Sequence, residues 1–241
     1  MNDKAKAELA PTGVLRAGIN LSNFLLVTSR AANGDPEGVS PDMARAIANE
    51  LGVPLKLIPF KSPGELGDRV DDNVWDIGNI GAEPQRAQKI SFTAAYCEIE
   101  ATYMVPAGSP INSIADVDKK GVRIAVTARA AYCLWLENNI KNATLVQVTG
   151  ADGAYRKFVD EKFEVMAGLR PGLIKDIENL PGARILDGKF SAVQQAVGTP
   201  KKNSAGADFL SAFVEDAKKS GLVARLIEKH KVKGLSVAPP A

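Results

Sequence analysis

The sequence predicts an α/β fold made of two Rossmann-like lobes joined by two hinge strands. Strand-like and helix-like segments alternate over residues 14–80, and a similar alternating set begins again after residue 110. This alternation is typical of parallel sheets whose strands are connected by crossover helices. Two strand-like segments, 101–108 and 192–200, join the sets without a low-complexity linker. We therefore expect lobe 1 to comprise residues 12–102 and 196–241, and lobe 2 residues 103–195.

The clearest helix of lobe 1 is predicted between residues 40 and 52. Ser40 is the expected N-cap, Pro41 the first helical residue and Gly52 the expected stop. Between them the apolar residues recur every four positions, at Met43, Ile47 and Leu51. This spacing predicts one apolar helix face.

The other elements follow from similar patterns. In lobe 1 we expect strand 14–20, a turn at 34–38, strand 54–60, a helix near 63–72 and strand 76–80. In lobe 2 we expect a short helix 114–118, strand 122–126, helix 130–140, strand 143–148, helix 154–162, strand 163–169, a helix near 172–179 and strand 183–186. Two helices, near 207–220 and 222–230, follow the return strand 192–200. Ligands of open α/β sheets bind beyond the carboxyl ends of strands, which predicts a site in a cleft between the lobes.

Composition excludes several classes of function. The chain has 241 residues, of which 45% are hydrophobic and 24% charged, as in ordinary soluble domains with a substantial core. A formal net charge of +2 and the absence of long Lys/Arg runs argue against a nucleic-acid partner. No stretch approaches the ~20 apolar residues that a membrane-spanning helix needs. The sequence therefore predicts a soluble, well-packed protein.

The sequence has too few cysteine and histidine side chains for a usual metal site, and we expect neither a metal nor a cofactor. Two isolated cysteines, Cys97 and Cys133, and the single histidine cannot form a usual zinc site. We expect two free, partly buried thiols, although a single bridge stays possible without geometry. His230 stands among lysines in the last helix and is expected on a solvated face. The first residues contain no apolar leader, so we expect a cytoplasmic protein, or a periplasmic one if a leader has been removed.

Four segments resemble, in order, blocks of one protein family. They are GVLRAGIN, EGVSPDMARAIANELGV, WDIGNIGAEPQRAQKISFTAAY and KKGVRIAV. The sequence is similar, over residues 12–231, to type II periplasmic solute-binding proteins, and most to the polar amino-acid-binding (family 3-like) proteins of ABC importers. The most specific pattern is Arg-x-x-x-Ile-x-Phe-Thr-x-x-Tyr at residues 86–96. The resemblance implies a non-enzymatic receptor that closes on a small carboxylate-containing solute, an amino acid or organic acid, and presents it to a membrane permease. We expect it to act as a monomer.

The resemblance assigns the main contact of lobe 1 to Arg86, whose equivalent in the family grips the solute carboxylate. A guanidinium offers a planar pair of donors that matches a carboxylate. The alternative is a surface salt bridge of little energetic value. Phe60 is either a lid over the solute or a core residue. The full set of further candidates in lobe 1 is Asn20, Ser22, Asn23, Phe60, Asn79 and Gly81.

Lobe 2 departs from the family pattern at two positions. Relatives carry a Gly-Thr pair at the helix start after the strand 122–126, where this chain has Arg129 and Ala130. The N-terminus of that helix can still offer N–H groups to an anion. Relatives also place an aspartate, which pairs with the solute's ammonium, after the strand 163–169. Here Arg170 stands at that position, and the alternative for it is a solvent-facing loop charge.

Three arginines, Arg86, Arg129 and Arg170, are therefore expected to converge on one cleft. Cations this close repel unless anionic charge lies between them, which favours a carboxylate or dicarboxylate over a zwitterionic amino acid. Glu98 or Glu100 could instead supply the amine contact or neutralise an arginine. The competing function is a cleft enzyme of the cyclohexadienyl or arogenate dehydratase type, in which one of these two acids would donate a proton.

Overall fold

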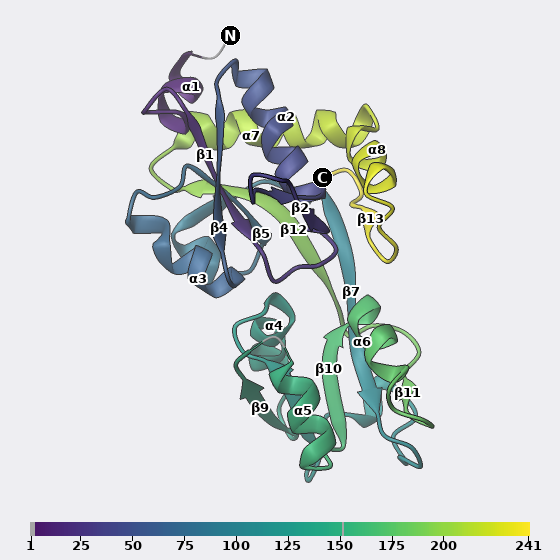
Figure 1. Cartoon of the computed structure of the whole chain (residues 1–241). Helices are drawn as coiled ribbons and strands as arrows, with labels where there is room; N and C mark the ends of the chain where they lie inside the picture. The colour runs from purple at the N-terminus through teal and green to yellow at the C-terminus, as the bar shows by residue number, and fades with distance from the viewer. Residues whose placement is uncertain (1–2, 151) are drawn as a thin grey trace. The chain divides into compact units, whose positions relative to one another are not determined.

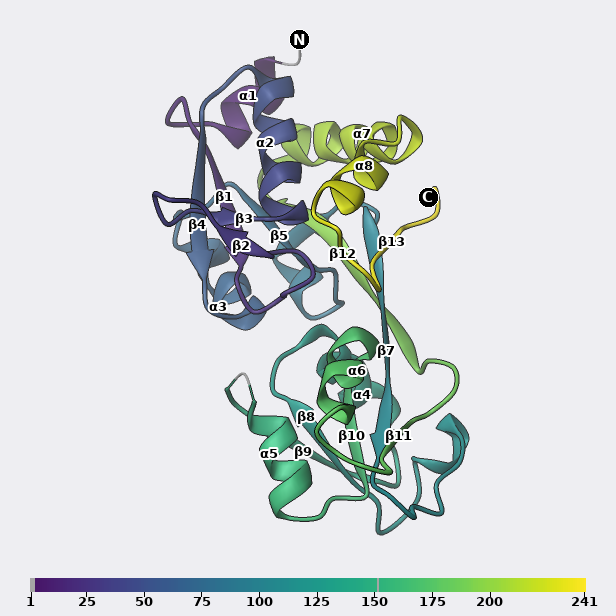
Figure 2. The same cartoon turned by 45° about the vertical axis from the view of Figure 1, so that its right-hand side comes forward.

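The computed structural model describes residues 3–150 and 152–241. The chain forms two compact units (Figures 1 and 2). Unit 1 contains the described residues up to Glu98 and those from Gln194 onward, and unit 2 contains Ile99–Val193. The chain passes from one unit to the other within two long strands, β7 (Cys97–Val105) and β12 (Ser191–Pro200). The lobe boundaries expected from the sequence, 102/103 and 195/196, lie within the same two strands.

Unit 1 is built on three parallel strands with β1 in the middle. β1 (Leu15–Asn20) pairs on one side with β4 (Leu55–Phe60) and on the other with β5 (Ile77–Gly81). Of these three strands, the one that follows β1 in the chain is thus on one side of it, and the last one returns to the other side. The strand order therefore reverses at β1.

Helices cover both faces of this sheet. α2 (Val39–Leu51) connects β1 to β4, while α3 (Pro63–Asp68) and a 3-10 turn (Arg69–Asp71) connect β4 to β5. The two crossovers run in opposite directions across the sheet, so right-handed connections place α2 and α3 on opposite faces. The predicted helix near 63–72 corresponds to α3 together with this 3-10 turn.

Antiparallel strands and the last helices complete unit 1. β12 runs antiparallel to β5 and also pairs with the short strand β6 (Ile90–Phe92). α7 (Ser204–Lys219) and α8 (Leu222–Lys229) follow β12. The strand β13 (Ser236–Val237), which the sequence analysis does not predict, pairs with the first residues of β7.

Two further elements of unit 1 were also not predicted. One is a hairpin of β2 (Ser29–Arg30) and β3 (Pro36–Glu37). The other is α1 (Asp3–Leu9), which packs against α7 so closely that a Cβ on Gly206 would lie 2.7 Å from Leu9 Cδ2. The carboxylate of Glu8 accepts a hydrogen bond from the Gly206 N–H at 2.8 Å. An acid at this position complements the dipole at the start of α7.

The prediction of Ser40 as the N-cap of α2 is wrong. The helix begins at Val39, and Gly38 is the N-cap, with φ 150°. A Cβ on Gly38 would lie 2.2 Å from the carbonyl oxygen of Leu26, so this close backbone approach requires glycine. The predicted stop is confirmed, since Gly52 adopts left-handed φ 62° at the end of the helix.

His230 is not on a solvated face, contrary to the prediction. It caps α8, its side chain is only 12% exposed, and its Nε2 lies 2.8 Å from Asp42 Oδ2. Lys229 donates to the same oxygen at 2.7 Å. Burial raises the pKa of Asp42, but the hydrogen bonds from Lys229 and His230 outweigh it, and the net pKa is lowered. Asp42 therefore ties the start of α2 to the end of α8.

Unit 2 repeats the central arrangement of unit 1. β8 (Arg123–Thr127) pairs in parallel with β9 (Thr144–Val148) on one side and β10 (Val165–Leu169) on the other. α4 (Ala131–Asn139) connects β8 to β9, and α5 (Gly153–Asp160) precedes β10. The strand order therefore reverses at β8, as it does at β1 in unit 1.

The remaining elements of unit 2 extend this sheet. β10 and the short β11 (Arg184–Ile185) run antiparallel to β7. α6 (Arg170–Ile177) follows β10 directly, and the predicted short helix at 114–118 is a 3-10 turn, Ile114–Asp116.

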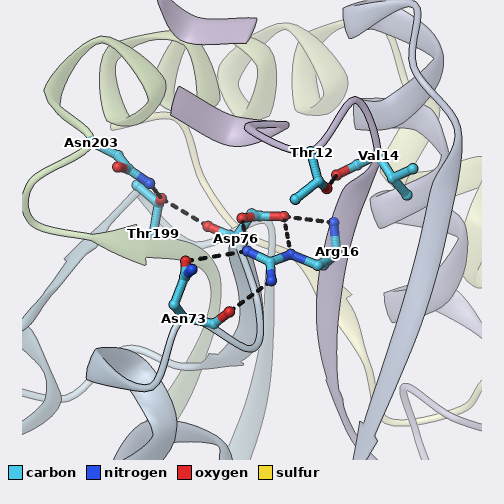
Figure 3. A network of polar contacts seen from close by, with 7 residues as sticks. All are labelled: Thr12, Val14, Arg16, Asn73, Asp76, Thr199 and Asn203. Atoms are coloured by element: carbon cyan, nitrogen blue, oxygen red, sulfur yellow. Dashed lines mark hydrogen bonds and ion pairs between the residues drawn. The ribbon is translucent and has the colours of Figure 1, made fainter. Parts of the chain in front are cut away.

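The amino-terminal ends of the two central strands of unit 1 are held together by an arginine–carboxylate pair (Figure 3). Arg16 donates to Asp76 Oδ2 from its backbone N–H and Nε, both at 2.9 Å, and to Oδ1 from Nη2 at 2.7 Å. Its Nη1 also donates to the carbonyl of Asn73 at 2.7 Å. The carbonyl of Asp76 in turn accepts from Thr199, which accepts from Asn203. The Asp76 side chain is 4% exposed, so these donors replace the water that its carboxylate has lost.

The same contact recurs in unit 2. Arg123 donates to Glu164 Oε2 from its backbone N–H and Nε, both at 2.9 Å, and to Oε1 from Nη2 at 2.8 Å. The same Nη2 also donates to the carbonyl of Lys162. Lys162 and Asn73 both have left-handed φ values, 51° and 55°. We call the Arg16–Asp76 and Arg123–Glu164 pairs the strand clamps.

Both cysteines are free, as predicted, but both are fully buried rather than partly buried. Cys97 lies in unit 1 and Cys133 in unit 2. Burial raises the pKa of Cys97 well above its usual range and that of Cys133 to about 11. Both thiols are therefore protonated near neutral pH.

Candidate functional site

Each unit has a topological switch point at the carboxyl ends of its central strands. In open α/β sheets ligands bind at this edge. In unit 1 the register pairs Ile19 with Asn79, so the segments that follow β1 and β5 leave the sheet at the same edge. In unit 2 the corresponding segments follow β8 and β10. The residues predicted for the site belong to these strand ends and the segments after them, although their roles in binding stay predictions.

Arg86 lies just beyond β5, in a 3-10 turn (Arg86–Gln88), and is half-buried. Its Nη1 donates to the carbonyl oxygen of Gly81, the last residue of β5, at 2.7 Å. Its alkyl stem lies beside α3, where a Cβ on Gly67 would be 3.8 Å from Arg86 Cδ. The side chain is therefore oriented by two contacts, that of its alkyl part with α3 and that of its guanidinium with the Gly81 carbonyl. An arginine fixed in this way loses less side-chain entropy when it binds an anion.

Glu83 lies three residues before Arg86 and is not among the residues predicted for the site. The Ala87 N–H donates to the Glu83 carbonyl at 2.9 Å, so residues 83–87 form a single turn. The carboxyl is half-buried and receives no hydrogen bond from any residue that the structure describes. Burial raises the pKa of Glu83 to about 7, although the charge of Arg86 works in the opposite direction.

The loop after β1 is organised by its own polar side chains. Asn20 Oδ1 accepts from the backbone N–H and the hydroxyl of Ser22, at 3.1 and 2.8 Å. Asn23, which is 8% exposed, accepts from the Leu25 N–H at 3.2 Å. Phe24 in the same loop is 38% exposed and is also not among the residues predicted for the site. An aromatic residue directly beyond the end of a central strand is the signal that could have identified it.

Asn79 and Phe60 are buried inside unit 1. Asn79 is 1% exposed and its Nδ2 donates to the carbonyl of Ser40 at 3.0 Å. Its Oδ1 has no partner within the described part of the chain. Phe60 is 6% exposed and belongs to a core cluster that includes Leu66 and Trp75. These contacts fit the core alternative for Phe60, and a ligand contact from either side chain stays a prediction.

In unit 2 the start of α4 has unusual backbone features. Ala130 is its N-cap and provides no side-chain hydrogen bond to the first turn. Arg129, which is exposed, has a left-handed φ of 61°. A non-glycine residue in this region is strained, and such strain is concentrated at functional sites. The first turn of α4 can thus present backbone N–H groups and its dipole to an anion.

Arg170 is neutralised within unit 2. Its Nε donates to Glu100 Oε2 at 2.7 Å, and its Nη2 donates to the carbonyl of Gly188. Glu98 is also engaged, because its Oε1 accepts from Gln194 Nε2 at 2.7 Å. The alternative in which Glu100 neutralises an arginine is therefore the one found. The expectation of a strongly anionic solute was based on three arginines, and Arg170 no longer supports it because Glu100 neutralises its charge.

Metal-binding and membrane-spanning features are not found in the described residues. No three His, Cys, Asp or Glu side chains in them are grouped as a metal site would require. Nor does any described helix have the length and apolar character needed to cross a membrane.

Comparisons with known proteins give one family and several similar folds. The sequence profile of the bacterial extracellular solute-binding proteins, family 3, matches residues 15–233. No curated protein sequence matches the chain. A mutant of ArgBP from T. maritima is 20% identical and has a TM-score of 0.73, with 95% of this chain and 100% of that chain covered.

Two more solved structures have the same fold. The amino acid ABC transporter substrate-binding protein AbpA from Streptococcus pneumoniae, bound to L-arginine, is 19% identical, with a TM-score of 0.72 and coverage of 93% of this chain and 98% of that chain. The ancestral amino acid-binding protein AncCDT-1, described as a precursor of cyclohexadienyl dehydratase, is 21% identical, with a TM-score of 0.73 and coverage of 95% and 99%.

These likenesses confirm the predicted α/β fold of the type II periplasmic binding proteins. The family profile extends over most of the chain and includes residues of both units. The chain therefore belongs to the bacterial extracellular solute-binding proteins of family 3.

Proposed function

We propose that this chain is the solute-binding receptor of an ABC importer, and that it binds and closes on a small solute that carries a carboxylate. Arg86 carries the proposal, because its half-buried guanidinium is oriented by the Gly81 carbonyl beyond the end of β5. In this proposal Arg86 forms a paired hydrogen bond with the carboxylate. Two findings support an amino acid or organic acid as the solute. The chain belongs to family 3 of the solute-binding proteins, and AbpA, which has the same fold, is bound to L-arginine.

Unit 2 is proposed to supply a second contact through the first turn of α4. The N–H groups of this turn, to which the Ala130 side chain makes no hydrogen bond, and Arg129 with its left-handed backbone would interact with a negatively charged part of the solute. Arg170 is proposed to act through its pairing with Glu100, which fixes the segment after β10, rather than as a free cation. The proposed partner is the permease of the importer, and the proposed location is the periplasm, where a monomer would meet it.

The test is a comparison of Arg86→Ala with Arg45→Ala, an arginine whose side chain is 57% exposed. Thermal-shift screening of the wild-type chain against amino acids, monocarboxylates and dicarboxylates first identifies a ligand, since stabilisation grows with RT ln(1 + [L]/Kd). We expect Arg86→Ala to weaken the binding of that ligand by about 2–4 kcal/mol, because the ligand carboxylate is left without its desolvated partner. Arg45→Ala should bind normally. Unchanged affinity in Arg86→Ala would remove Arg86 from the site.

An enzyme on the same scaffold is the second candidate. Glu83 favours it, because a carboxyl with a pKa of about 7 can act as a general acid near neutrality. Glu98 and Glu100, the acids expected from the sequence, are engaged by Gln194 and Arg170. Incubation with arogenate, monitored by absorbance of the aromatic product, tests this function. If the wild-type chain turns over arogenate and Glu83→Gln does not, the enzyme function replaces the proposed receptor function.

A further inference from the structure

The tip of the β2–β3 hairpin (Figure 2) contains an asparagine next to a glycine, Asn33 and Gly34. Asn33 is the only asparagine of the sequence that is followed by glycine. The backbone nitrogen of the residue after an asparagine can attack the carbonyl carbon of the asparagine side chain. Glycine has no Cβ to hinder this approach, so the reaction is least hindered at this pair.

The fold itself requires the glycine. Gly34 has a left-handed φ of 88°, a conformation that favours glycine over any other residue. Its N–H donates to the Ala31 carbonyl at 2.9 Å, and the Ala31 N–H donates to the Asp35 carbonyl at 2.9 Å, which closes the hairpin. The conformation that makes this tight turn therefore also places an unhindered nitrogen beside Asn33.

The turn is exposed, so few contacts protect it. Asn33, Gly34 and Asp35 are all exposed, and a Cβ on Gly34 would meet no described atom within 4 Å. The attacking nitrogen becomes free when its hydrogen bond to Ala31 opens. The need to break one exposed hydrogen bond of this kind slows a reaction by about tenfold at most. The folded turn therefore slows the attack without preventing it.

The side chain of Asn33 is held in a way that favours attack on its carbonyl carbon. Its Oδ1 accepts a hydrogen bond from the Asp35 N–H at 3.1 Å. A backbone donor at this oxygen stabilises the negative charge that develops on it during the attack. Its Nδ2 donates to Asp35 Oδ2 at 2.8 Å, so the nitrogen that leaves lies beside a carboxylate.

We propose that Asn33 is a site of spontaneous deamidation in the folded protein. The Gly34 nitrogen forms a bond to Asn33 Cγ, and its proton leaves with the side-chain amide as ammonia, which closes a succinimide ring. Water then opens the ring at either carbonyl and gives aspartate or isoaspartate. The net reaction consumes one water molecule and releases one ammonia molecule, and it requires no oxidant. This inference is independent of the proposed receptor function.

The modification should loosen the hairpin. The Asn33 amide that donates to the Asp35 carboxylate is replaced by a second carboxylate, and like charges at this distance repel. Isoaspartate also adds a methylene group to the main chain within the turn that the Ala31 N–H closes. We therefore expect faster hydrogen exchange over residues 28–37 after deamidation.

The experiment incubates the full chain at mildly alkaline pH and follows tryptic peptides by chromatography and mass spectrometry. Cleavage after Arg30 and Arg45 gives peptide 31–45, in which Asn33 is the only asparagine. Cleavage after Lys89 and Lys119 gives peptide 90–119, in which Asn112 is the only asparagine. Asn112 is also exposed but is followed by serine, so it is the internal control. The matched variants are Asn33→Gln and Asn112→Gln, and a sample that has not been incubated corrects for conversion during digestion.

We expect peptide 31–45 to convert several-fold faster than peptide 90–119, at a rate that rises with pH because the attacking nitrogen must lose its proton. The products should include isoaspartate as well as aspartate. Asn33→Gln should abolish the fast conversion, while Asn112→Gln should leave it unchanged. Conversion of Asn112 as fast as that of Asn33 would overturn the proposal. Aspartate without isoaspartate would also overturn it, since direct hydrolysis of the amide, with no ring, gives aspartate alone.

Discussion

Replacing Glu83 with glutamine should stabilise the ligand-free protein, and should do so more strongly as the pH rises. The folded state raises the pKa of Glu83 from 4.5 to about 7, mainly through burial. A raised pKa means that the folded protein binds this proton more tightly than the unfolded chain. The associated stability is therefore complete below about pH 4.5 and is lost as the pH rises through about 7.

The difference between a pKa of 4.5 and one of about 7 corresponds to about 3.4 kcal/mol. Because the carboxyl is only half-buried, solvent screening reduces this limit to about 1–2 kcal/mol. Glutamine has the same shape without the charge, so the variant should gain this amount over the wild type between about pH 5 and about pH 8. Urea unfolding of both proteins at several pH values measures the difference. A difference that stays constant with pH would refute the reasoning, and Glu50→Gln controls for the loss of a surface carboxylate.

Two other predictions concern the scaffold. Asp76→Asn should lower the free energy of unfolding by about 3 kcal/mol, because it leaves the mostly buried Arg16 without its charge partner, while Glu164→Gln in the more exposed clamp should lower it by about 1 kcal/mol. Urea unfolding measures both, and equal losses would show that burial does not set the value of a clamp. Cys97 and Cys133, both fully buried, should react with a maleimide only after unfolding, as followed by mass spectrometry. Rapid labelling of the native protein would mean that one of these thiols becomes accessible in solution.

The regular elements could be predicted from sequence because their signals are local. α2 is an example, since Met43, Ile47 and Leu51 mark its buried face and Gly52 its end. The start of α2 could not be predicted, because Gly38 is required by the approach of Leu26, which lies twelve residues earlier and has no local pattern. The two-residue strand β13 is defined only by its pairing with β7, more than a hundred residues away.

The candidate site shows the same division between local and long-range signals. The motif identifies Arg86, but the orientation of its guanidinium depends on the carbonyl of Gly81 in the folded turn. Glu83 stands beside it in the sequence as an ordinary loop acid, and only the fold reveals that its carboxyl is half-buried and accepts no hydrogen bond from the described residues. The pairing of Arg170 with Glu100 joins residues far apart in the chain, so the sequence could only leave it open as an alternative.

The strand clamps have a consequence for how such a receptor can change its ligand. In each unit the clamp fixes the amino-terminal ends of two strands that are neighbours in the sheet but not in the chain. The residues proposed to contact solute lie at or beyond the opposite ends of these strands. Strand alignment is thus secured at a distance from the loops. Residues 20–24 and 82–86 can accordingly be randomised in libraries that seek new solutes, with both clamps kept intact, because the alignment of the sheet does not depend on the loops being varied.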